Sequence, residues 1–376
     1  MPHFDIVRRS KPVKSFRVAS VMGTYDLQNE QISERFVGNI DLPEKWNVGL
    51  IVGRSGTGKT TIATELFGAH IYRGGQNYTH ECLLDDFPQD ATMSEIYQAL
   101  TAVGFASPPD WLKSYHVLSN GEKMRCDIAR AMLENKEMFV FDEFTSVVDR
   151  NIAQIASLAI QKAIRKNGRQ FIAVTCHHDV QEWLMPDWVF NTDTMTFSKF
   201  DLEEQKKNRP AIQLDVVATE HKKFYWEMFK KYHYLTSSFN PSAHVWLCFV
   251  NGNLAGFCSF IAFPHPTAKN IWKAHRVVVF PDYQGVGVAS NMLKIVADEL
   301  QRLGKKVTLT SSNIAMIQAL KKSSLWICSR IGRMNRPNNA SYVKHLAETF
   351  SCNKITAAFE YVGEANKKYV CKKKTR

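Results

Sequence analysis

The order of apolar and polar residues predicts two consecutive folded units in this chain. In the first half, short apolar runs predict buried strands at 50–52, 138–141 and 171–175. Apolar residues at helical spacing predict helices at 93–103, 124–133 and 152–166. Such alternation of strands and helices is typical of an α/β fold. Before these elements, alternation over 16–21 predicts an edge strand, and Pro108 with Pro109 predicts a break in the chain.

The second half has a different order of elements. Strands are predicted at 245–250, 254–262, 275–280 and 307–310, and helices at 220–234 and 290–302. Asn251, Gly252 and Asn253 predict a hairpin turn between the first two of these strands. On the helix at 220–234, Phe224, Met228 and Tyr232 fall on one face, which predicts that this face packs in the core.

A charged stretch without periodicity at 201–208, followed by Pro210, separates the two units. We therefore predict a first domain over 1–203, a linker over 204–211 and a second domain over 212–376. A chain of 376 residues is long enough for two domains that each bury a core.

Composition agrees with a globular protein, and the charge is unevenly divided. Hydrophobic residues make up 45% of the chain and charged residues 22%, and no apolar run approaches the ~18 residues of a membrane span. The basic N-terminus lacks an apolar signal segment, and the eight scattered cysteines form no C-x-x-C pair, so we expect reduced thiols in the cytoplasm. Residues 201–376 carry 27 Lys and Arg against 12 Asp and Glu. This excess favours a polyanionic partner, and a merely solvated basic surface is the alternative.

A glycine-rich turn follows the apolar run at 50–52 and matches the phosphate-binding pattern G-x-x-x-x-G-K-[ST] at every fixed position. Its glycines let backbone N–H groups converge on phosphate oxygens, and the next helix directs its positive end there. Lys59 is expected to reach the outer phosphates, and the Thr60 hydroxyl to hold Mg²⁺. The predicted ATP contacts of this turn are Gly53, Ser55, Gly56, Gly58, Lys59, Thr60 and Thr61. Tyr25 or Phe36 is a candidate to stack on the base, with ordinary packing as the alternative.

Acidic and histidine residues follow the next two apolar runs. Asp142 ends the run at 138–141, where it can hold Mg²⁺ directly or through water. Glu143 points to the opposite side and can polarise an attacking water. His177 and His178 follow the run at 171–175, and a histidine there can contact the γ-phosphate. Charged residues often end strands at a sheet edge, so only the combination predicts ATP hydrolysis.

In this order the features resemble the ABC ATPase family over about residues 15–200. Residues 118–122, Leu-Ser-Asn-Gly-Glu, correspond to the family signature LSGGQ, and 146–149 correspond to its SxxD loop. The resemblance implies that Ser119 and Gly121 close over ATP bound by a second copy, in a homodimer through the ATPase domains. It also implies Gln89 as a nucleotide contact, Glu143 as a catalytic residue and His178 as the switch histidine, with His177 as second choice. The segment between Gln89 and the signature is short, as in soluble members that act on nucleic acids, so no membrane partner is expected.

A second glycine-rich turn precedes the helix at 290–302. It lacks a lysine and a metal-binding hydroxyl, so it suits a diphosphate-bearing cofactor better than a magnesium nucleotide, and a simple strand-to-helix turn is the alternative. The turn consists of Gln284, Gly285, Val286, Gly287, Val288 and Ala289.

With its neighbouring elements this turn resembles the GNAT acyltransferase family, over about residues 212–330. The resemblance implies an α+β domain whose turn amides bind the pyrophosphate of acetyl-CoA or another acyl-CoA. It also implies that Val277 and Val279 pair with the pantetheine arm and that Asn313 opens the following helix. The family's catalytic tyrosine is missing, which leaves Ser323, Ser324, Tyr234 and Tyr342 as candidates. Tyr232, His233 and Tyr234 form a candidate acceptor pocket, with aromatic packing as the alternative.

The whole chain therefore resembles an ABC-type ATPase fused to a GNAT-type domain, and its second half is loosely similar to Mom-type proteins that modify DNA. The resemblance and the charge predict acyl transfer to an amine of DNA or tRNA, driven or switched by ATP. One alternative is acetylation of a protein or small amine under ATP regulation. Another is an ATP-switched nucleic-acid clamp whose GNAT fold is not catalytic.

Overall fold

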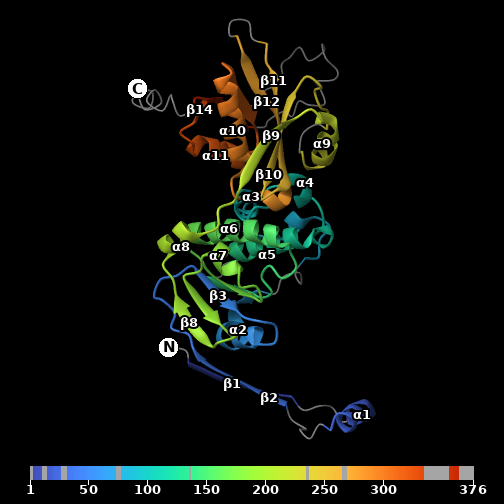
Figure 1. Cartoon of the computed structure of the whole chain (residues 1–376), viewed down its shortest axis with the longest axis vertical. Coiled ribbons are helices and arrows are strands. Elements are labelled where there is room, and N and C mark those ends of the chain that lie inside the picture. The colour runs from blue at the N-terminus through green and yellow to red at the C-terminus, as the bar shows by residue number, and fades with distance from the viewer. Residues whose placement is uncertain are drawn as a thin grey trace.

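The computed structural model describes residues 3–10, 15–26, 32–72, 78–134, 137–233, 237–264, 269–333 and 355–363 (Figure 1). The strands are β1 His3–Ser10, β2 Ile32–Asn39, β3 Val48–Val52, β4 Ile71–Tyr72, β5 Met138–Phe141, β6 Gln170–Thr175, β7 Trp188–Asn191, β8 Thr196–Lys199, β9 Leu214–Thr219, β10 His244–Val250, β11 Asn253–Ala262, β12 Ile271–Val279, β13 Lys306–Ser311, β14 Trp326–Arg333 and β15 Ile355–Tyr361. The α-helices are α1 Phe16–Thr24, α2 Lys59–Phe67, α3 Met93–Ala102, α4 Pro108–Trp111, α5 Asn120–Leu133, α6 Arg150–Lys166, α7 Val180–Leu184, α8 Leu202–Asn208, α9 Lys222–Phe229, α10 Val288–Arg302 and α11 Ile314–Lys322. Short 3₁₀ turns are η1 Gly68–His70, η2 Leu83–Asp86, η3 Tyr115–Val117, η4 Lys230–Tyr232 and η5 Pro281–Tyr283.

The first domain is built on a six-stranded sheet in the order β4-β5-β6-β3-β7-β8. Strands β3 to β7 within it are parallel, and β8 alone runs antiparallel to its neighbour β7. Successive residues of the buried strand β3 point to opposite faces. Leu50 packs in the hydrophobic cluster that contains α3, α5 and α6, whereas Ile51 packs in the cluster that contains α2. The sheet is therefore covered by helices on both faces, as an α/β fold requires.

The second domain is built on a seven-stranded sheet in the order β14-β15-β13-β12-β11-β10-β9. Among the strand pairs described in this sheet, β12 with β13 is parallel and the others are antiparallel, and helix α10 packs on this sheet. The predicted hairpin between β10 and β11 is confirmed, because Asn251 and Gly252 both adopt the positive φ that a two-residue turn needs, 49° and 80°. The first sheet ends at Lys199 and the second begins at Leu214, on either side of the predicted linker over 204–211.

The two domains are stacked along the long axis of the molecule, and the β1–β2 ribbon projects from the end of the first domain with α1 at its tip (Figure 1). The contact between the domains is formed by α3 to α6 of the first and by η5 with the turn after it in the second. Ile155 of α6 is fully buried in the hydrophobic cluster of the second domain. The domains therefore share part of one core.

Four expectations from the sequence are wrong. The segment at 16–21 forms helix α1, because Ser15 caps its N-terminus and no strand in the described part of the chain pairs with it. Pro108 and Pro109 begin α4, since proline suits the first turn of a helix. The charged stretch at 201–208 contains helix α8, capped by Asp201, with acidic residues in its first turn and basic ones in its last.

The fourth correction concerns the face of α9 that packs in the core. Phe224 and Met228 are 65% and 41% exposed, and the buried residues of this helix are Trp226 and Phe229. These two rings pack on Phe257 of β11, with ring centroids 5.5 and 5.6 Å away. Both faces of α9 carry aromatic residues, so spacing alone did not distinguish them.

We expect Phe171→Ala to lower the free energy of unfolding by about 3–5 kcal/mol, because the side chain is fully buried between Phe139 and Phe144. Phe16→Ala is the matched control: its ring is 89% exposed, and the expected change is under about 0.5 kcal/mol. Chemical unfolding of the full chain, followed by circular dichroism, measures both. Equal unfolding midpoints for the two variants would contradict the assigned packing.

Candidate functional site

The phosphate-binding turn lies between β3 and α2, and its glycines adopt conformations that other residues rarely reach. Gly56 and Gly58 both have φ of +85°, and Gly58 is the N-cap of α2. A Cβ on Gly58 would lie 2.5 Å from Cε1 of Phe36, which is itself buried. Phe36 therefore packs under the turn and is not available to stack on a base, whereas Tyr25 is 72% exposed on α1.

Side chains of the turn are held within it. The Lys59 Nζ donates to the backbone carbonyl of Arg54 at 2.8 Å, so its charge lies over the turn. Thr57 contacts the hydroxyl of Thr192 at 2.6 Å, and the backbone N–H of Arg54 donates to Asp193 at 3.1 Å. Exposed backbone N–H groups, a helix N-terminus and one ammonium group fit the phosphates of a nucleotide.

The predicted magnesium and catalytic carboxylates lie at the same sheet edge as this turn. Because β3, β6 and β5 are parallel, their carboxyl ends meet there. Strand β6 lies between β3 and β5, so Asp142 is two strand spacings, about 10 Å, from the start of the turn. The Asp142 carboxylate accepts the backbone N–H of Glu143 at 2.9 Å, and Glu143 has a positive φ of 56°.

The two candidate switch histidines have different surroundings. His178 is half exposed, and its Nε2 lies 3.2 Å from Asp193, the carboxylate that also binds Arg54 of the phosphate turn. Hydrogen bonds from Arg54 hold the pKa of Asp193 below its usual range. His177 is less accessible, and burial together with the nearby Arg150 lowers its pKa. His178 is thus linked to the phosphate turn through Asp193, and its role as the switch stays a prediction.

The signature residues cap helix α5. Ser119 Oγ accepts the N–H of Glu122 at 3.3 Å, and the Glu122 carboxylate accepts the N–H of Ser119 at 2.9 Å. Ser119 is exposed, but Gly121 is buried, and a Cβ on it would lie 3.4 Å from the Asp282 carboxylate of the second domain. Gln89 lies in an exposed turn before α3.

No group of three or more His, Cys, Asp or Glu side chains in the described part of the chain is arranged to hold a metal ion. The predicted Mg²⁺ site has two protein ligands, the Thr60 hydroxyl and Asp142. Mg²⁺ bound with a nucleotide commonly keeps waters and phosphate oxygens as its other ligands, so this small donor set fits a nucleotide-bound Mg²⁺.

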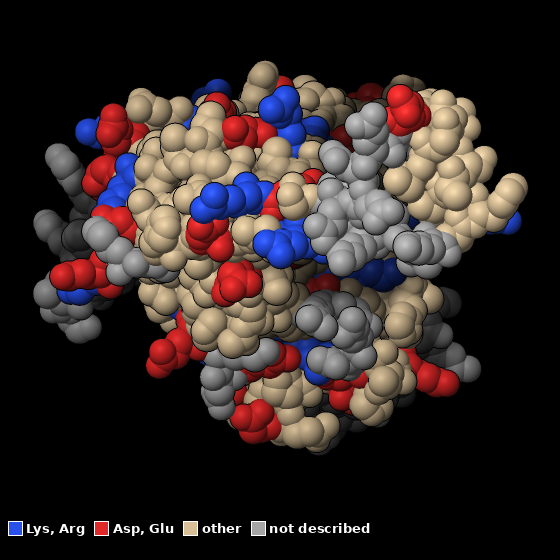
Figure 2. All heavy atoms as spheres, turned by 90° about the horizontal axis from the view of Figure 1, so that it is seen from below, with Lys and Arg blue, Asp and Glu red and all other residues tan. Residues whose placement is uncertain are grey.

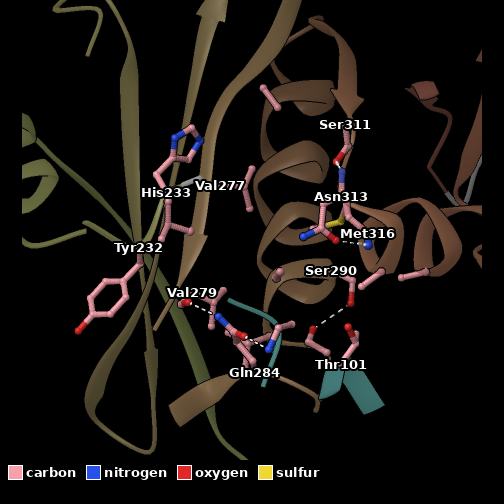
Figure 3. A pocket seen from close by; sticks show the side chains of 18 of the residues that line it. Thr101, Tyr232, His233, Val277, Val279, Gln284, Ser290, Ser311, Asn313 and Met316 are labelled. Carbon is pink, nitrogen blue, oxygen red and sulfur yellow. Dashed lines mark hydrogen bonds between the residues drawn. The ribbon is translucent and has the colours of Figure 1, made fainter. Parts of the chain in front are cut away.

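A cavity of about 380 Å³ in the second domain contains most of the predicted acyl-CoA residues. Strands β12 and β13 pair only where Ile271, Trp272 and Lys273 face residues 306–308, and beyond that point they separate. Figure 3 shows His233 and Val277 on one side of the resulting space, with Ser311, Asn313 and Ser290 on the other. The lining includes the predicted residues Val277, Val279, Gln284, Gly285, Gly287, Val288, Ala289 and Asn313.

Val286 is the exception among the predicted acyl-CoA residues. It does not line the cavity but packs partly against the hydrophobic cluster of the second domain. Its neighbours Gly285 and Gly287 line the cavity. A backbone contact from Val286 to a cofactor stays a prediction.

The N-terminus of helix α10 forms the floor of the cavity, and its conformation suits an anion. Gly287 is the N-cap of α10 with φ of +90°, and it leaves the first N–H groups of the helix without a side-chain cap. Asn313 caps α11 nearby, where its Oδ1 accepts the N–H of Met316 at 3.0 Å. A phosphate group fits the open end of α10, because N–H groups and the helix dipole both favour negative charge there.

Several cavity residues were not predicted from the sequence. Thr101, Ala106 and Pro108 of the first domain line the same cavity, and no local pattern marks them. His275 of β12 also lines it, and burial lowers its pKa to about 4. The acceptor-pocket candidates Tyr232 and His233 line the cavity, and their role in binding an acceptor stays a prediction, whereas Ser323 and Ser324 do not line it. The candidates Tyr234 and Tyr342 lie outside the described residues.

Comparison with known proteins finds relatives of two different kinds. A model of the Acetyltransferase (GNAT) family matches residues 178–323. The spermidine/putrescine import ATP-binding protein PotA of Borreliella afzelii is 28% identical over 182 residues, which cover 39% of this chain and 51% of that protein. The oligopeptide transport ATP-binding protein OppD of Lactococcus lactis subsp. cremoris is 27% identical over 175 residues, covering 43% and 49%.

Among solved structures, the ribosomal-protein-S18-alanine N-acetyltransferase of Escherichia coli is similar, with 18% identity and a TM-score of 0.30 over 40% of this chain and 97% of that one. The chain spans about half the length of the curated ATP-binding relatives it matches. Its first half is an ABC ATPase-like domain, and its second half contains a GNAT-like domain. The chain is thus a fusion of these two domain types. No helix in the described residues is long and apolar enough to cross a membrane.

We expect Gly287→Glu to abolish acetyl-CoA binding, because the new side chain would strain a φ of +90° and place a carboxylate at the N-terminus of α10. Gly304→Glu is the control: Gly304 has φ of +72° just after the other end of α10, with open space around it. Calorimetric titration of the full chain with acetyl-CoA measures both variants. An unchanged affinity in Gly287→Glu would remove this turn from the site.

Proposed function

We propose that the protein binds and hydrolyses ATP in its first domain and transfers an acyl group from acyl-CoA to an amine in its second. The observation that carries the transferase proposal is the cavity between the separated strands β12 and β13, which ends at Gly287 and the open N-terminus of α10. We place the protein in the cytoplasm.

In the first domain, Lys59 and the backbone of the phosphate turn bind the phosphates, and Thr60 and Asp142 hold Mg²⁺. Bound ATP would supply the terminal phosphoryl group. Water attacks its phosphorus, the bond to the bridging oxygen breaks, and ADP and inorganic phosphate leave. Glu143 orients that water, and His178, held by Asp193, contacts the outer phosphate. Ser119 and Gly121 of a second copy complete the site in a head-to-tail homodimer. The exposed capping position of Ser119 supports this arrangement.

In the second domain, the cavity orients an acyl donor. A bound acyl-CoA would supply a thioester. The acceptor nitrogen attacks the thioester carbonyl carbon, the C–S bond breaks, and CoA leaves as a thiol after taking up the proton that the amine loses. The edge of β12 that no longer pairs with β13, at Val277 and Val279, would hold the pantetheine arm, and the N-terminus of α10 would hold the pyrophosphate. His233 and His275 lie along the β12 side of the cavity, and burial keeps His275 neutral at physiological pH.

We propose that the acceptor is an amine of DNA or tRNA. The excess of 27 basic over 12 acidic residues at 201–376 supports this assignment. Lys230 and Lys231 precede Tyr232 at the cavity, and the Lys231 ammonium lies 4.9 Å from the centre of the Tyr232 ring. The face at the ATPase end, by contrast, has basic and acidic side chains interspersed (Figure 2). Phosphates are therefore expected at the second domain.

Lys59→Ala is expected to weaken ATP binding by about ten- to a hundredfold, because a charged hydrogen-bond donor contributes about 1.5–3 kcal/mol. Lys45→Ala is the control, since Lys45 is exposed and precedes β3, at the end of the strand opposite to the phosphate turn.

Glu143→Gln is expected to keep ATP affinity, to lose hydrolysis and to sediment as a dimer with Mg²⁺ and ATP. Hydrolysis by Glu143→Gln at the wild-type rate would contradict the role of Glu143.

For the acceptor, mass spectrometry of nucleosides in DNA and tRNA from cells that express the protein is expected to reveal an acylated base. The modification is expected to disappear in Gly287→Glu and to fall in Glu143→Gln if hydrolysis drives it. Binding of DNA or tRNA is expected to weaken steeply between 50 and 200 mM salt. Acyl transfer to a protein or small amine that polynucleotide does not inhibit would favour the alternative acceptor. Failure to bind acetyl-CoA would favour a non-catalytic clamp.

A further inference from the structure

The acyl-donor turn packs against the ATPase domain on one side. Gly285 touches Gly104 at the end of α3: a Cβ on Gly285 would lie 2.7 Å from the Gly104 Cα and 3.0 Å from the Cβ of Ala159 on α6. Gly104 itself has φ of +88° and could not carry a side chain either, since its Cβ would lie 2.7 Å from the Gln284 carbonyl. Two backbones therefore meet here directly, and a shift of one displaces the other.

Gln284 ties the same two segments together by hydrogen bonds. Its Oε1 accepts the backbone N–H of Ala106 in the ATPase domain at 2.8 Å, and its Nε2 donates to the carbonyl of Val279 at 2.9 Å (Figure 3). This side chain thus joins the segment between α3 and α4 to the end of β12. Ala106 and Val279 both line the cavity, so the two hydrogen bonds of Gln284 lie in the wall of the donor site.

Arg125 of helix α5 makes the third connection. Its side chain is completely buried, and it donates to the carbonyls of Pro281 at 2.7 Å and Asp282 at 2.9 Å. The Asp282 carboxylate lies 3.8 Å from the same guanidinium. These carbonyls belong to η5, which immediately precedes the donor turn. A buried guanidinium is costly unless it is paired, so this side chain is held firmly to the second domain.

The same helix begins at the signature. Ser119 caps α5, and Arg125 follows six residues later, about 9 Å along the helix axis. Gly121, between them, faces Asp282. A helix of this length moves as one rigid body, so a displacement of the signature end is transmitted to the carbonyls of η5.

We propose that Arg125 is a positioning residue of the acyl-donor site and that, through it, the nucleotide state of the ATPase domain sets the affinity of the second domain for acyl-CoA. This inference rests on the proposed function, because it requires both ATP and acyl-CoA to bind. The affinity of the acyl-CoA site then depends on residues of both domains. Affinity changes between such linked sites are reciprocal, so acyl-CoA must alter the affinity for nucleotide by the same factor.

The test is calorimetric titration of the full chain with acetyl-CoA, with and without a saturating non-hydrolysable ATP analogue and Mg²⁺. In the wild type the two dissociation constants are expected to differ by at least about fivefold. Arg125→Lys keeps the charge but loses the bidentate contact to the carbonyls of Pro281 and Asp282. In this variant the difference between the two dissociation constants is expected to fall below about twofold. Its affinity for the ATP analogue in the absence of acetyl-CoA is expected to be unchanged.

Arg130→Lys is the matched control. Arg130 lies on the same helix, and its ion pair with Glu134 and its contact with the Tyr78 ring are within the ATPase domain. It is expected to keep the wild-type coupling. Gln284→Met is a second test variant in case Arg125→Lys folds poorly. It removes the hydrogen bond from Ala106 through a change in the second domain, and it is also expected to reduce the effect of the ATP analogue on acetyl-CoA affinity.

The outcomes separate the inference from the function on which it rests. If the wild type binds no acetyl-CoA or no ATP analogue, the proposed function fails. If both bind and each is indifferent to the other, the function stands and the inference is overturned. Loss of coupling in Arg130→Lys as well as in Arg125→Lys would also overturn it, because the effect would then come from general loosening of α5.

Discussion

The close approach of two glycines, Gly104 and Gly285, is the contact on which the arrangement of this protein depends. Each lies in a left-handed conformation where a side chain would be strained. A Cβ on Gly285 would meet the Gly104 backbone, and a Cβ on Gly104 would meet the carbonyl of Gln284. The contact brings the turn that precedes α10 against the end of α3. Arg125 and Gln284 then bind across the same joint, so the wall of the cavity is built from two domains.

The two glycine-rich turns, one in each domain, have the same local structure before a helix. Gly58 and Gly287 each cap a helix in the left-handed conformation, at 85° and 90°, and each leaves N–H groups free for a negative ligand. The first turn follows a central strand of a parallel sheet and carries Lys59. The second follows β12, whose separation from β13 opens a cavity for a long ligand. The charge of Lys59 at the first turn and the cavity beside the second turn suit ligands that carry different phosphate groups.

Local signals succeeded where a few neighbouring residues decide the conformation, and failed where packing decided it. The hairpin at Asn251 and the cap at Asn313 follow from short-range hydrogen bonds and φ preferences, and both are present. By contrast, alternation at 16–21 did not predict α1, since a strand needs a partner strand and none of the strands that the structure describes pairs with this segment. On α9, aromatic residues occupy both faces, and only the position of Phe257 determined which face is buried.

The sequence alone determined that this chain contains two glycine-rich turns that each precede a helix, the residues that cap the helices after them, and the order of the two domain types. These features depend on steric limits and hydrogen bonds within a few residues. The tertiary structure decided which distant residues share a site: β6 lies between the strands that carry the phosphate turn and Asp142, and Thr101 lines the acyl-donor cavity. Gly104 and Gly285 have no local relation, because their contact arises only when two separately built sheets and their helices pack together.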